Sequence, residues 1–226
     1  MSGTVRRVAL TGGIATGKTH VRARIEQRGV ATIDSDTLAR EAVAAGSSGL
    51  ASVVERFGRD ILDADGALNR ARLGAIVFAD PVARRDLEAI VHPQVRRATD
   101  DWFDSLDATV HPFAVADIPL LFEVGREGDF NVVIVVACHP ETQVRRVMER
   151  DGLTESEARQ RLAAQLPISD KVNRADFVIR TDGSYAETNE QVDAVLSVVN
   201  PMISFDAWRK VKELWRSVRD GWTPES

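Results

Sequence analysis

Residues 8–19 read Val-Ala-Leu-Thr-Gly-Gly-Ile-Ala-Thr-Gly-Lys-Thr, and this stretch decides the fold. A short apolar run, residues 8–10, precedes the segment 12–19, which matches G-x-x-x-x-G-K-[ST] in full. A helical pattern follows over residues 19–28. An apolar strand, a glycine-rich loop and a helix in this order predict a phosphate-binding loop in an α/β protein.

Each residue type in the motif has a physical reason. Gly12 and Gly17 allow tight turns and a close approach of the backbone to a ligand. Successive N–H groups and the positive end of the following helix then point at phosphate oxygens. Lys18 brings a point charge, and Thr19 offers a hydroxyl to Mg²⁺. The residues expected to bind ATP in this region are Gly12, Gly13, Ile14, Ala15, Thr16, Gly17, Lys18, Thr19 and His20.

Further short apolar runs alternate with helical patterns along the chain. The runs are residues 30–33, 113–116, 132–138 and 177–179, and the helical patterns are residues 35–45, 141–150, 154–166 and 185–199. Apolar runs without polar alternation are typical of strands buried on both faces. The pattern therefore predicts an α/β fold with a central parallel sheet and helices on both of its faces.

Two segments interrupt this alternation. Residues 46–106 lack a strong strand and read as helices, for example 70–78 and 82–103, with a kink or break expected at Pro93. Residues 154–174 form a second, shorter helical insertion. We therefore expect a core of residues 1–45 and 107–200 with an insertion at 46–106. Residues 201–226 are expected to form a C-terminal helix that packs on its own domain, the alternative being a helix that docks a partner.

Composition excludes several classes of protein. The 226 residues contain 29 Lys+Arg and 34 Asp+Glu, a net charge of −5, which argues against broad nucleic-acid binding. Cys138 is the only cysteine, so neither an internal disulfide framework nor a multi-cysteine metal site can form. No apolar run approaches the ~20 residues of a membrane span, and no leader is visible. We expect a cytoplasmic protein without membrane or nucleic-acid partners.

Two carboxylates follow the second expected strand. Asp34 and Asp36 lie where ligands of parallel sheets bind, just beyond a strand's carboxyl end. One of them is expected to cap the next helix, and the other could orient a hydroxyl nucleophile and take its proton. Arg40 lies one helical turn beyond Asp36, on the same face. Asp117, at the end of another strand, is a weaker candidate for a Mg²⁺ carboxylate.

The chain resembles the dephospho-coenzyme A kinases, P-loop kinases of the nucleoside-monophosphate-kinase type, from about residue 8 to residue 199. The matching segments are residues 11–18 (the phosphate loop), 33–40 (Asp-x-Asp-x-x-Ala-Arg), 90–93 (His-Pro), 119–123 (Pro-Leu-Leu-x-Glu), 143–150 (the arginine helix), 161–165 (the lid) and 175–179 (the last strand). Apart from the phosphate loop each segment is a weak signal, but their common order is specific.

The resemblance implies a three-layer α/β/α kinase fold with a five-stranded parallel sheet, a helical substrate-binding insertion and a lid at 154–174. It implies ATP-dependent phosphorylation of the ribose 3′-hydroxyl of dephospho-CoA, with Mg²⁺ as the metal. Asp36 would act on the hydroxyl, and Lys18 and Arg146 would stabilise the transferring phosphoryl group. The remaining implied contacts are Arg150 with ATP, and Asp36, Arg40, His92 and Leu120 with dephospho-CoA.

Three departures from the family pattern stand out. Ala15 occupies a position where the family usually has glycine, Thr19 replaces serine, and Thr181-Asp182-Gly183 replaces Asn-x-Gly. The alternative functions are another small-molecule or nucleoside monophosphate kinase, a GTPase-type switch and an inactive relative. The GTPase lacks support because no Asn-Lys-x-Asp element is present. We expect a monomer or a weak homo-oligomer.

Overall fold

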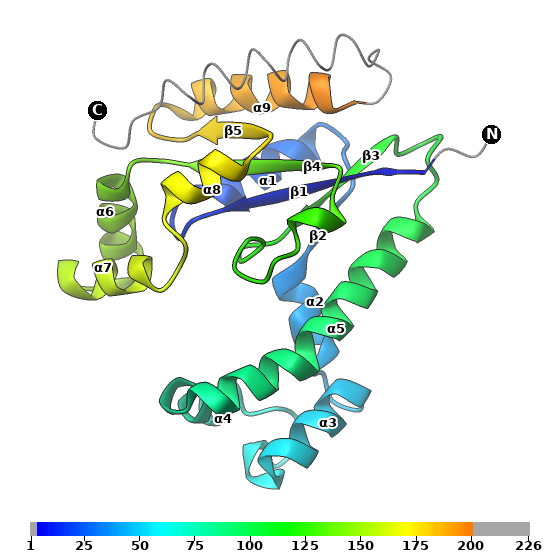
Figure 1. Ribbon diagram of the computed structural model, residues 1–226, viewed down its shortest axis with the longest axis vertical. Coiled ribbons are helices and arrows are strands. Elements are labelled where there is room, and N and C mark those ends of the chain that lie inside the picture. The colour runs from blue at the N-terminus through cyan, green and yellow to red at the C-terminus, as the bar shows by residue number, and fades with distance from the viewer. Residues whose placement is uncertain (1–3, 201–226) are drawn as a thin grey trace. The chain divides into compact units, whose positions relative to one another are not determined.

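The computed structural model describes residues 4–200, and Figure 1 shows their path. Five strands form one parallel sheet in the order β2-β3-β1-β4-β5. Their bounds are Arg6–Gly12 (β1), Thr32–Asp34 (β2), Phe113–Asp117 (β3), Val132–Ala137 (β4) and Phe177–Arg180 (β5). The predicted fold class is confirmed.

The sheet is held by the apolar runs that predicted it. Every residue of β3 and β4 is buried, because both faces of these strands are covered. In β1, burial is complete from Val8 onward. β1 lies between β3 and β4, with Leu10 opposite Asp117 and Gly12 opposite Val136. The phosphate loop therefore leaves the sheet from a central strand.

Helices cover the sheet on both sides. Helix α1 (Lys18–Gln27) and helix α9 (Tyr185–Val199) pack with the sheet in one apolar core, to which Val21, Ile25 and Val195 belong. Helix α8 (Ile168–Arg174) packs against β4, and Figure 1 shows it in front of the strands with α1 behind them. Arg24 of α1 and Arg28, the residue that caps the C-terminus of α1, bind Asp193 of α9. Their hydrogen bonds hold the pKa of that carboxyl well below its usual range.

The arginine helix and the lid follow β4. Helix α6 (Pro140–Asp151) ends at Gly152, which adopts the left-handed conformation that favours glycine. Helix α7 (Glu155–Ala163) begins with a reciprocal capping box between Thr154 and Glu157. The pattern over residues 154–166 predicted this helix, which ends three residues earlier than expected and is followed by α8.

The described residues divide into two compact units. The first contains the sheet and takes in the described residues up to Ile33 and from Leu106 onward. The second, Asp34–Ser105, contains four α-helices: α2 (Ser35–Ala42), α3 (Ser48–Phe57), α4 (Arg70–Ala79) and α5 (Pro81–Ser105). A short 3₁₀ turn, η1, spans Arg59–Ile61, and a second one in the first unit, η2, spans Glu127–Asp129. The second unit thus includes α2 as well as the helices expected over 46–106.

Helix α5 corrects one expectation. We expected a kink or break at Pro93, but the helix runs through this residue without interruption for 25 residues. Val95, Thr99 and Phe103 are buried beyond the proline, and Thr99 donates its hydroxyl to the carbonyl of Val95 at 2.7 Å. Packing of this face therefore maintains the helix although Pro93 lacks an N–H donor. Residues 201–226, expected to form a C-terminal helix, lie outside the described residues.

Among residues 4–200, no helix combines the length and the apolar content that crossing a membrane would need.

Candidate active site

The phosphate loop adopts a left-handed turn at two positions. Gly17 has a φ of 85° and precedes α1 as its N-cap, and no side chain caps the helix there. Ala15 has a φ of 57° and is the only non-glycine residue with positive φ in the part of the chain described. The first turn of α1 also contains no acidic residue. Its N–H groups and the positive end of its dipole are therefore available to an anion.

Gly12 ends β1 in a space too small for any side chain. A Cβ atom at this position would lie 2.6 Å from the carbonyl oxygen of Val136 and 2.7 Å from Oγ1 of Thr16. The Thr16 hydroxyl itself donates to the carbonyl of Gly13 at 2.9 Å, which closes the turn. The motif glycine is thus required by close packing against β4 as well as by the loop conformation.

Lys18 lies on the first turn of α1 and forms an ion pair with Asp117. Asp117 ends β3 and its side chain is only 3% exposed. Its second oxygen lies 3.4 Å from the guanidinium of Arg22, one helical turn beyond Lys18. The carboxylate expected only weakly from the sequence therefore lies beside the lysine of the phosphate loop.

Two glutamines hold the peptide groups of Ile14. The Ile14 N–H donates to Oε1 of Gln165 at 2.9 Å, and the Ile14 carbonyl accepts from Nε2 of Gln143 at 2.7 Å. Gln143 belongs to α6 and is buried, whereas Gln165 follows α7. The loop is thereby connected to the arginine helix and to the lid segment.

Arg146 connects the phosphate loop to the segment after β5. Its guanidinium donates to the carbonyl of Ala15 at 3.4 Å and to the carbonyl of Thr181 at 2.6 Å. The Thr181 hydroxyl in turn donates to the carbonyl of Thr16 at 2.6 Å. Arg150 is directed elsewhere, into an exposed ion pair with Asp151. Of the two arginines expected to contact ATP or the phosphoryl group, the structure places Arg146 against the loop.

Asp34 and Asp36 have separate roles in the structure. Asp34 is the N-cap of α2, and its carboxylate accepts the N–H of Asp36 at 2.9 Å. The side chain of Asp36 is exposed in the first turn of that helix. Arg40 and His92, on α2 and α5 of the same unit, are exposed as well. The capping question left open by the sequence is therefore answered in favour of Asp34.

Leu120 and His20 were also expected to contact ligands. Leu120, expected to contact substrate, is 44% exposed in the segment after β3. His20, expected to contact ATP, accepts or donates a hydrogen bond with Asn189 at 3.0 Å, and its ring lies 4.5 Å from that of Tyr185. The His20 side chain is thus directed at α9.

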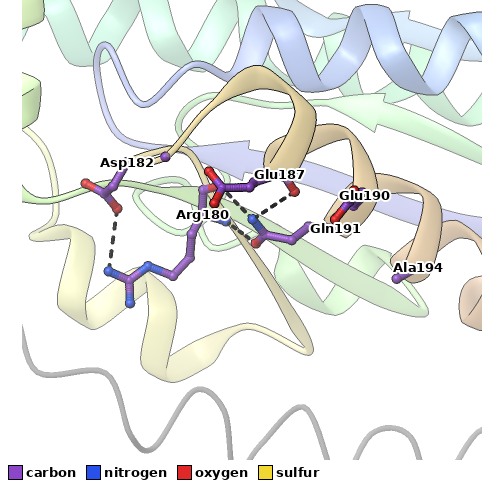
Figure 2. A pocket seen from close by; sticks show the side chains of 7 residues that line it. Arg180, Asp182, Glu187, Glu190, Gln191 and Ala194 are labelled. Carbon is purple, nitrogen blue, oxygen red and sulfur yellow. Dashed lines mark hydrogen bonds and ion pairs between the residues drawn. The ribbon is translucent and has the colours of Figure 1, made fainter.

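An open hollow lies beside β5 and the first turns of α9 (Figure 2). The side-chain amide of Gln191 forms two hydrogen bonds with the backbone of Arg180: its Oε1 accepts the Arg180 N–H at 2.8 Å, and its Nε2 donates to the Arg180 carbonyl at 3.0 Å. Gln191 thereby covers the free edge of the last strand. Asp182 accepts the N–H of His139 at 2.8 Å and lies 3.5 Å from the Arg180 guanidinium. These contacts hold the segment that replaces the family's Asn-x-Gly.

The side chains near the phosphate loop include oxygen donors suited to Mg²⁺. Thr19 is exposed beside Lys18, and Asp117 offers a carboxylate, so both supply the hard oxygen donors that Mg²⁺ prefers. Within residues 4–200 no group of three His, Cys, Asp or Glu side chains is placed to hold a metal. A donor set of this size fits a Mg²⁺ ion whose other ligands come from nucleotide phosphates and water.

Sequence reasoning missed several residues that contact the loop. Gln143, Gln165 and Lys171 lie more than 120 positions away along the chain, and none belongs to a spacing motif with residues 12–19. A partial signal existed, because Gln143 and Gln165 fall inside the segments that resemble the arginine helix and the lid. Lys171 had no such signal, because it lies in the mostly polar segment Ile-Ser-Asp-Lys-Val-Asn-Arg, residues 168–174.

Comparisons with known proteins agree with this geometry. The family model described as dephospho-CoA kinase matches residues 6–187. A dephospho-CoA kinase of Cutibacterium acnes is 47% identical over 208 residues, which cover 91% of this chain and 89% of the relative. One from Anaeromyxobacter dehalogenans is 48% identical and covers 85% of this chain and 92% of the relative.

Solved structures give the same result. The crystal structure of TT1252 from Thermus thermophilus aligns with a TM-score of 0.74 at 36% identity, covering 86% of this chain and 98% of that one. The dephospho-CoA kinase of Campylobacter jejuni aligns with a TM-score of 0.67 at 29% identity, covering 86% and 96%. The similarity thus extends over nearly the whole length of both solved chains.

Proposed function

The chain belongs to the dephospho-CoA kinase family, and from this premise we propose how its residues carry out the ATP-dependent phosphorylation of dephospho-CoA at the ribose 3′-hydroxyl. The observation that supports the proposal most directly is the phosphate loop, with Gly17 in the left-handed conformation and Lys18 and Thr19 at the start of α1. The protein is accordingly a kinase of CoA biosynthesis.

The phosphate loop would bind the donor. Backbone N–H groups around residues 13–19, apart from that of Ile14, which donates to Gln165, would hold the ATP phosphates together with the start of α1. Lys18 would neutralise charge on the β- and γ-phosphates. Phosphoryl transfer spreads negative charge over the equatorial oxygens, and a well-placed arginine accelerates it by about 10³–10⁵-fold. We assign this role to Arg146 because it is the arginine of α6 that contacts the loop.

Mg²⁺ would be held by Thr19 and Asp117 together with ATP oxygens. The ion supplies charge neutralisation on the β- and γ-phosphates. In this arrangement the Asp117 carboxylate would be shared between Lys18 and the metal, and the Lys18 ammonium would face the phosphates. Arg22 remains beside the second oxygen of Asp117 and keeps that carboxylate oriented.

Asp36 would act on the acceptor. With Asp34 engaged as the helix cap, the exposed carboxylate of Asp36 can accept a hydrogen bond from the ribose 3′-hydroxyl and take its proton during in-line attack. Arg40, His92 and Leu120 remain the proposed contacts of dephospho-CoA, and Arg150 and His20 remain proposed contacts of ATP. Residues 46–106 would hold dephospho-CoA. The lid at 154–174 would close to exclude water through its α7 part, because α8 is already packed against β4.

We expect activity in the cytoplasm as a monomer or weak homo-oligomer, without nucleic-acid or membrane partners.

The test of this function is phosphoryl transfer by the purified full chain. With ATP and Mg²⁺, dephospho-CoA should stimulate ADP formation and yield CoA, whereas nucleoside monophosphates and sugar acids should not. ADP release with dephospho-CoA no higher than in the acceptor-free blank would refute the activity. A faster reaction with another acceptor would instead identify a different small-molecule kinase.

Asp36 is tested by a matched pair of substitutions. Asp36→Asn should lower kcat by about 10²–10⁴-fold, because general-base catalysis contributes on that order, and should leave KM for ATP unchanged. Asp34→Asn is the control, since asparagine caps a helix as well as aspartate does. A D36N enzyme with a kcat close to that of D34N would remove Asp36 from the mechanism.

A further inference from the structure

Lys171 is a completely buried lysine whose ammonium lies against the phosphate loop. Its side chain is 0% exposed, although lysine is almost never fully buried unless it is paired. Its Nζ atom lies 2.7 Å from Oε1 of Glu123, 3.2 Å from the carbonyl of Gly12 and 3.4 Å from the carbonyl of Pro119. An ammonium has three donors, and three acceptors surround this one.

The three acceptors come from separate parts of the chain. Gly12 ends β1 and begins the phosphate loop, while Pro119 and Glu123 belong to the segment after β3. The Pro119 carbonyl also accepts the Thr11 hydroxyl at 3.2 Å. Oε1 of Glu123 additionally accepts the N–H of Leu166 at 3.1 Å. Lys171 thus joins the start of the phosphate loop to the segment that follows the strand of Asp117.

This placement controls a peptide plane. In a trans peptide the C=O of one residue and the N–H of the next lie in one plane and point in opposite directions. Holding the Gly12 carbonyl toward Lys171 therefore directs the Gly13 N–H away from it. The same reasoning applies two peptides further along, where Gln143 holds the Ile14 carbonyl and so orients the Ala15 N–H.

We propose that Lys171 is a positioning residue of the kinase: paired with Glu123, it holds the Gly12–Gly13 peptide in the orientation that the phosphates of the nucleotide require. Lys171 does not itself reach substrate, because it is buried beneath the loop. Preorganised N–H donors contribute to transition-state stabilisation because they need no reorganisation when charge develops. The proposal rests on the function proposed above, in which this loop binds the ATP phosphates.

The balance of charges supports a role beyond packing. A buried ion pair is often no more stabilising than apolar residues of similar volume, so stability alone does not account for a lysine at this position. Oε2 of Glu123 is buried and has no hydrogen-bond partner among the described residues, so the pair is not even fully satisfied. What the pair does supply is a cation aimed at the Gly12 carbonyl.

The test uses Lys171→Met, which keeps an unbranched side chain and removes the ammonium. We expect KM for ATP and the dissociation constant of ADP, measured by calorimetry, to rise at least about tenfold, with KM for dephospho-CoA changing less than about threefold. ADP should also raise the melting temperature of the variant less than it raises that of the unsubstituted protein. If Lys171 had a purely structural role, the variant would melt at a lower temperature both with and without ADP. Its affinity for ADP, measured below those melting temperatures, would then equal that of the unsubstituted protein, and this result would overturn the proposal.

Two further variants keep the test decisive. Arg24→Met is the control, because it removes the cation of the Arg24–Asp193 ion pair, which lies between α1 and α9 and does not involve the phosphate loop. This variant should leave KM for ATP unchanged. Glu123→Gln preserves shape, so it carries the test if Lys171→Met fails to fold. It should raise KM for ATP about threefold or more, and a normal KM would overturn the proposal. If the unsubstituted protein binds ADP but transfers no phosphate to dephospho-CoA, the proposed function fails while the role of Lys171 is still measured by ADP binding.

Discussion

The ammonium of Lys18 and the carboxylate of Asp117 form an ion pair at the carboxyl edge of the sheet. The two residues are 99 positions apart in sequence, and they meet because β1 and β3 are neighbouring parallel strands. The lysine of the phosphate loop is therefore paired with a buried acid.

Substitution Asp117→Asn should separate the metal role from folding. The amide is a weaker ligand for Mg²⁺, so we expect kcat to fall about 10²-fold and the Mg²⁺ concentration for half-maximal rate to rise. Stability should fall by only about 1 kcal/mol, because Lys18 and Arg22 remain partly exposed to water. Rates across a Mg²⁺ titration and a denaturant melt provide the two measurements.

Asp129→Asn is the matched control, since Asp129 forms an ion pair with the buried Arg126 in the same unit. It should lose stability without any change in the Mg²⁺ requirement. An unchanged Mg²⁺ titration in D117N would leave Asp117 with the ion pair alone and remove it from the metal site.

Substitution Ala15→Gly should stabilise the protein. The left-handed conformation of Ala15 costs roughly 1–2 kcal/mol, and glycine at this position removes that strain. Glycine also raises the conformational entropy of the unfolded chain, which offsets about 0.4–1 kcal/mol of the gain. The expected net gain is about 0.5–1 kcal/mol, seen as a higher melting temperature with little change in kcat. The family's usual glycine at this position is consistent with that direction.

Ala23→Gly on the exposed side of α1 provides the comparison, because its helical backbone has negative φ and glycine should cost about 1 kcal/mol there. Equal destabilisation by both substitutions would contradict the strain argument for residue 15.

The single cysteine should be inert in the folded protein. Cys138 is buried, and burial raises the pKa of its thiol to about 11. At pH 8 only about one molecule in a thousand then carries the reactive thiolate, against roughly a quarter for an ordinary thiol. Iodoacetamide at pH 8 should therefore modify the native protein far more slowly than the same protein in guanidinium chloride. Comparable rates in the two conditions would contradict both the burial and the raised pKa.

Much of the sheet could be predicted from the sequence because burial on both faces leaves a direct pattern. The runs at 113–116 and 132–138 became β3 and β4 almost without change. Helix α5 could not be judged locally: Pro93 argued for a break, yet packing of Val95, Thr99 and Phe103 keeps one helix. Burial of this face stabilises the helix by more than the loss of one backbone hydrogen bond at Pro93 destabilises it.

The sequence by itself determined the features whose cause lies within a few residues. The spacing of Gly12, Gly17, Lys18 and Thr19 predicted the phosphate loop, because the turn, the charge and the helix start are all local. The two aspartates at and just beyond the end of β2 predicted one cap, although only the structure identified Asp34 as that cap.

Tertiary structure decided which distant side chains support the loop. Asp117 reaches Lys18, Gln165 reaches Ile14 and Lys171 reaches Gly12 only because the strand order β3-β1-β4 brings their segments to the same edge of the sheet. Hydrogen bonds and ion pairs depend on distances of a few ångströms. Such distances, between residues 99 to 159 positions apart, are set by the packing of the whole sheet and by no local pattern.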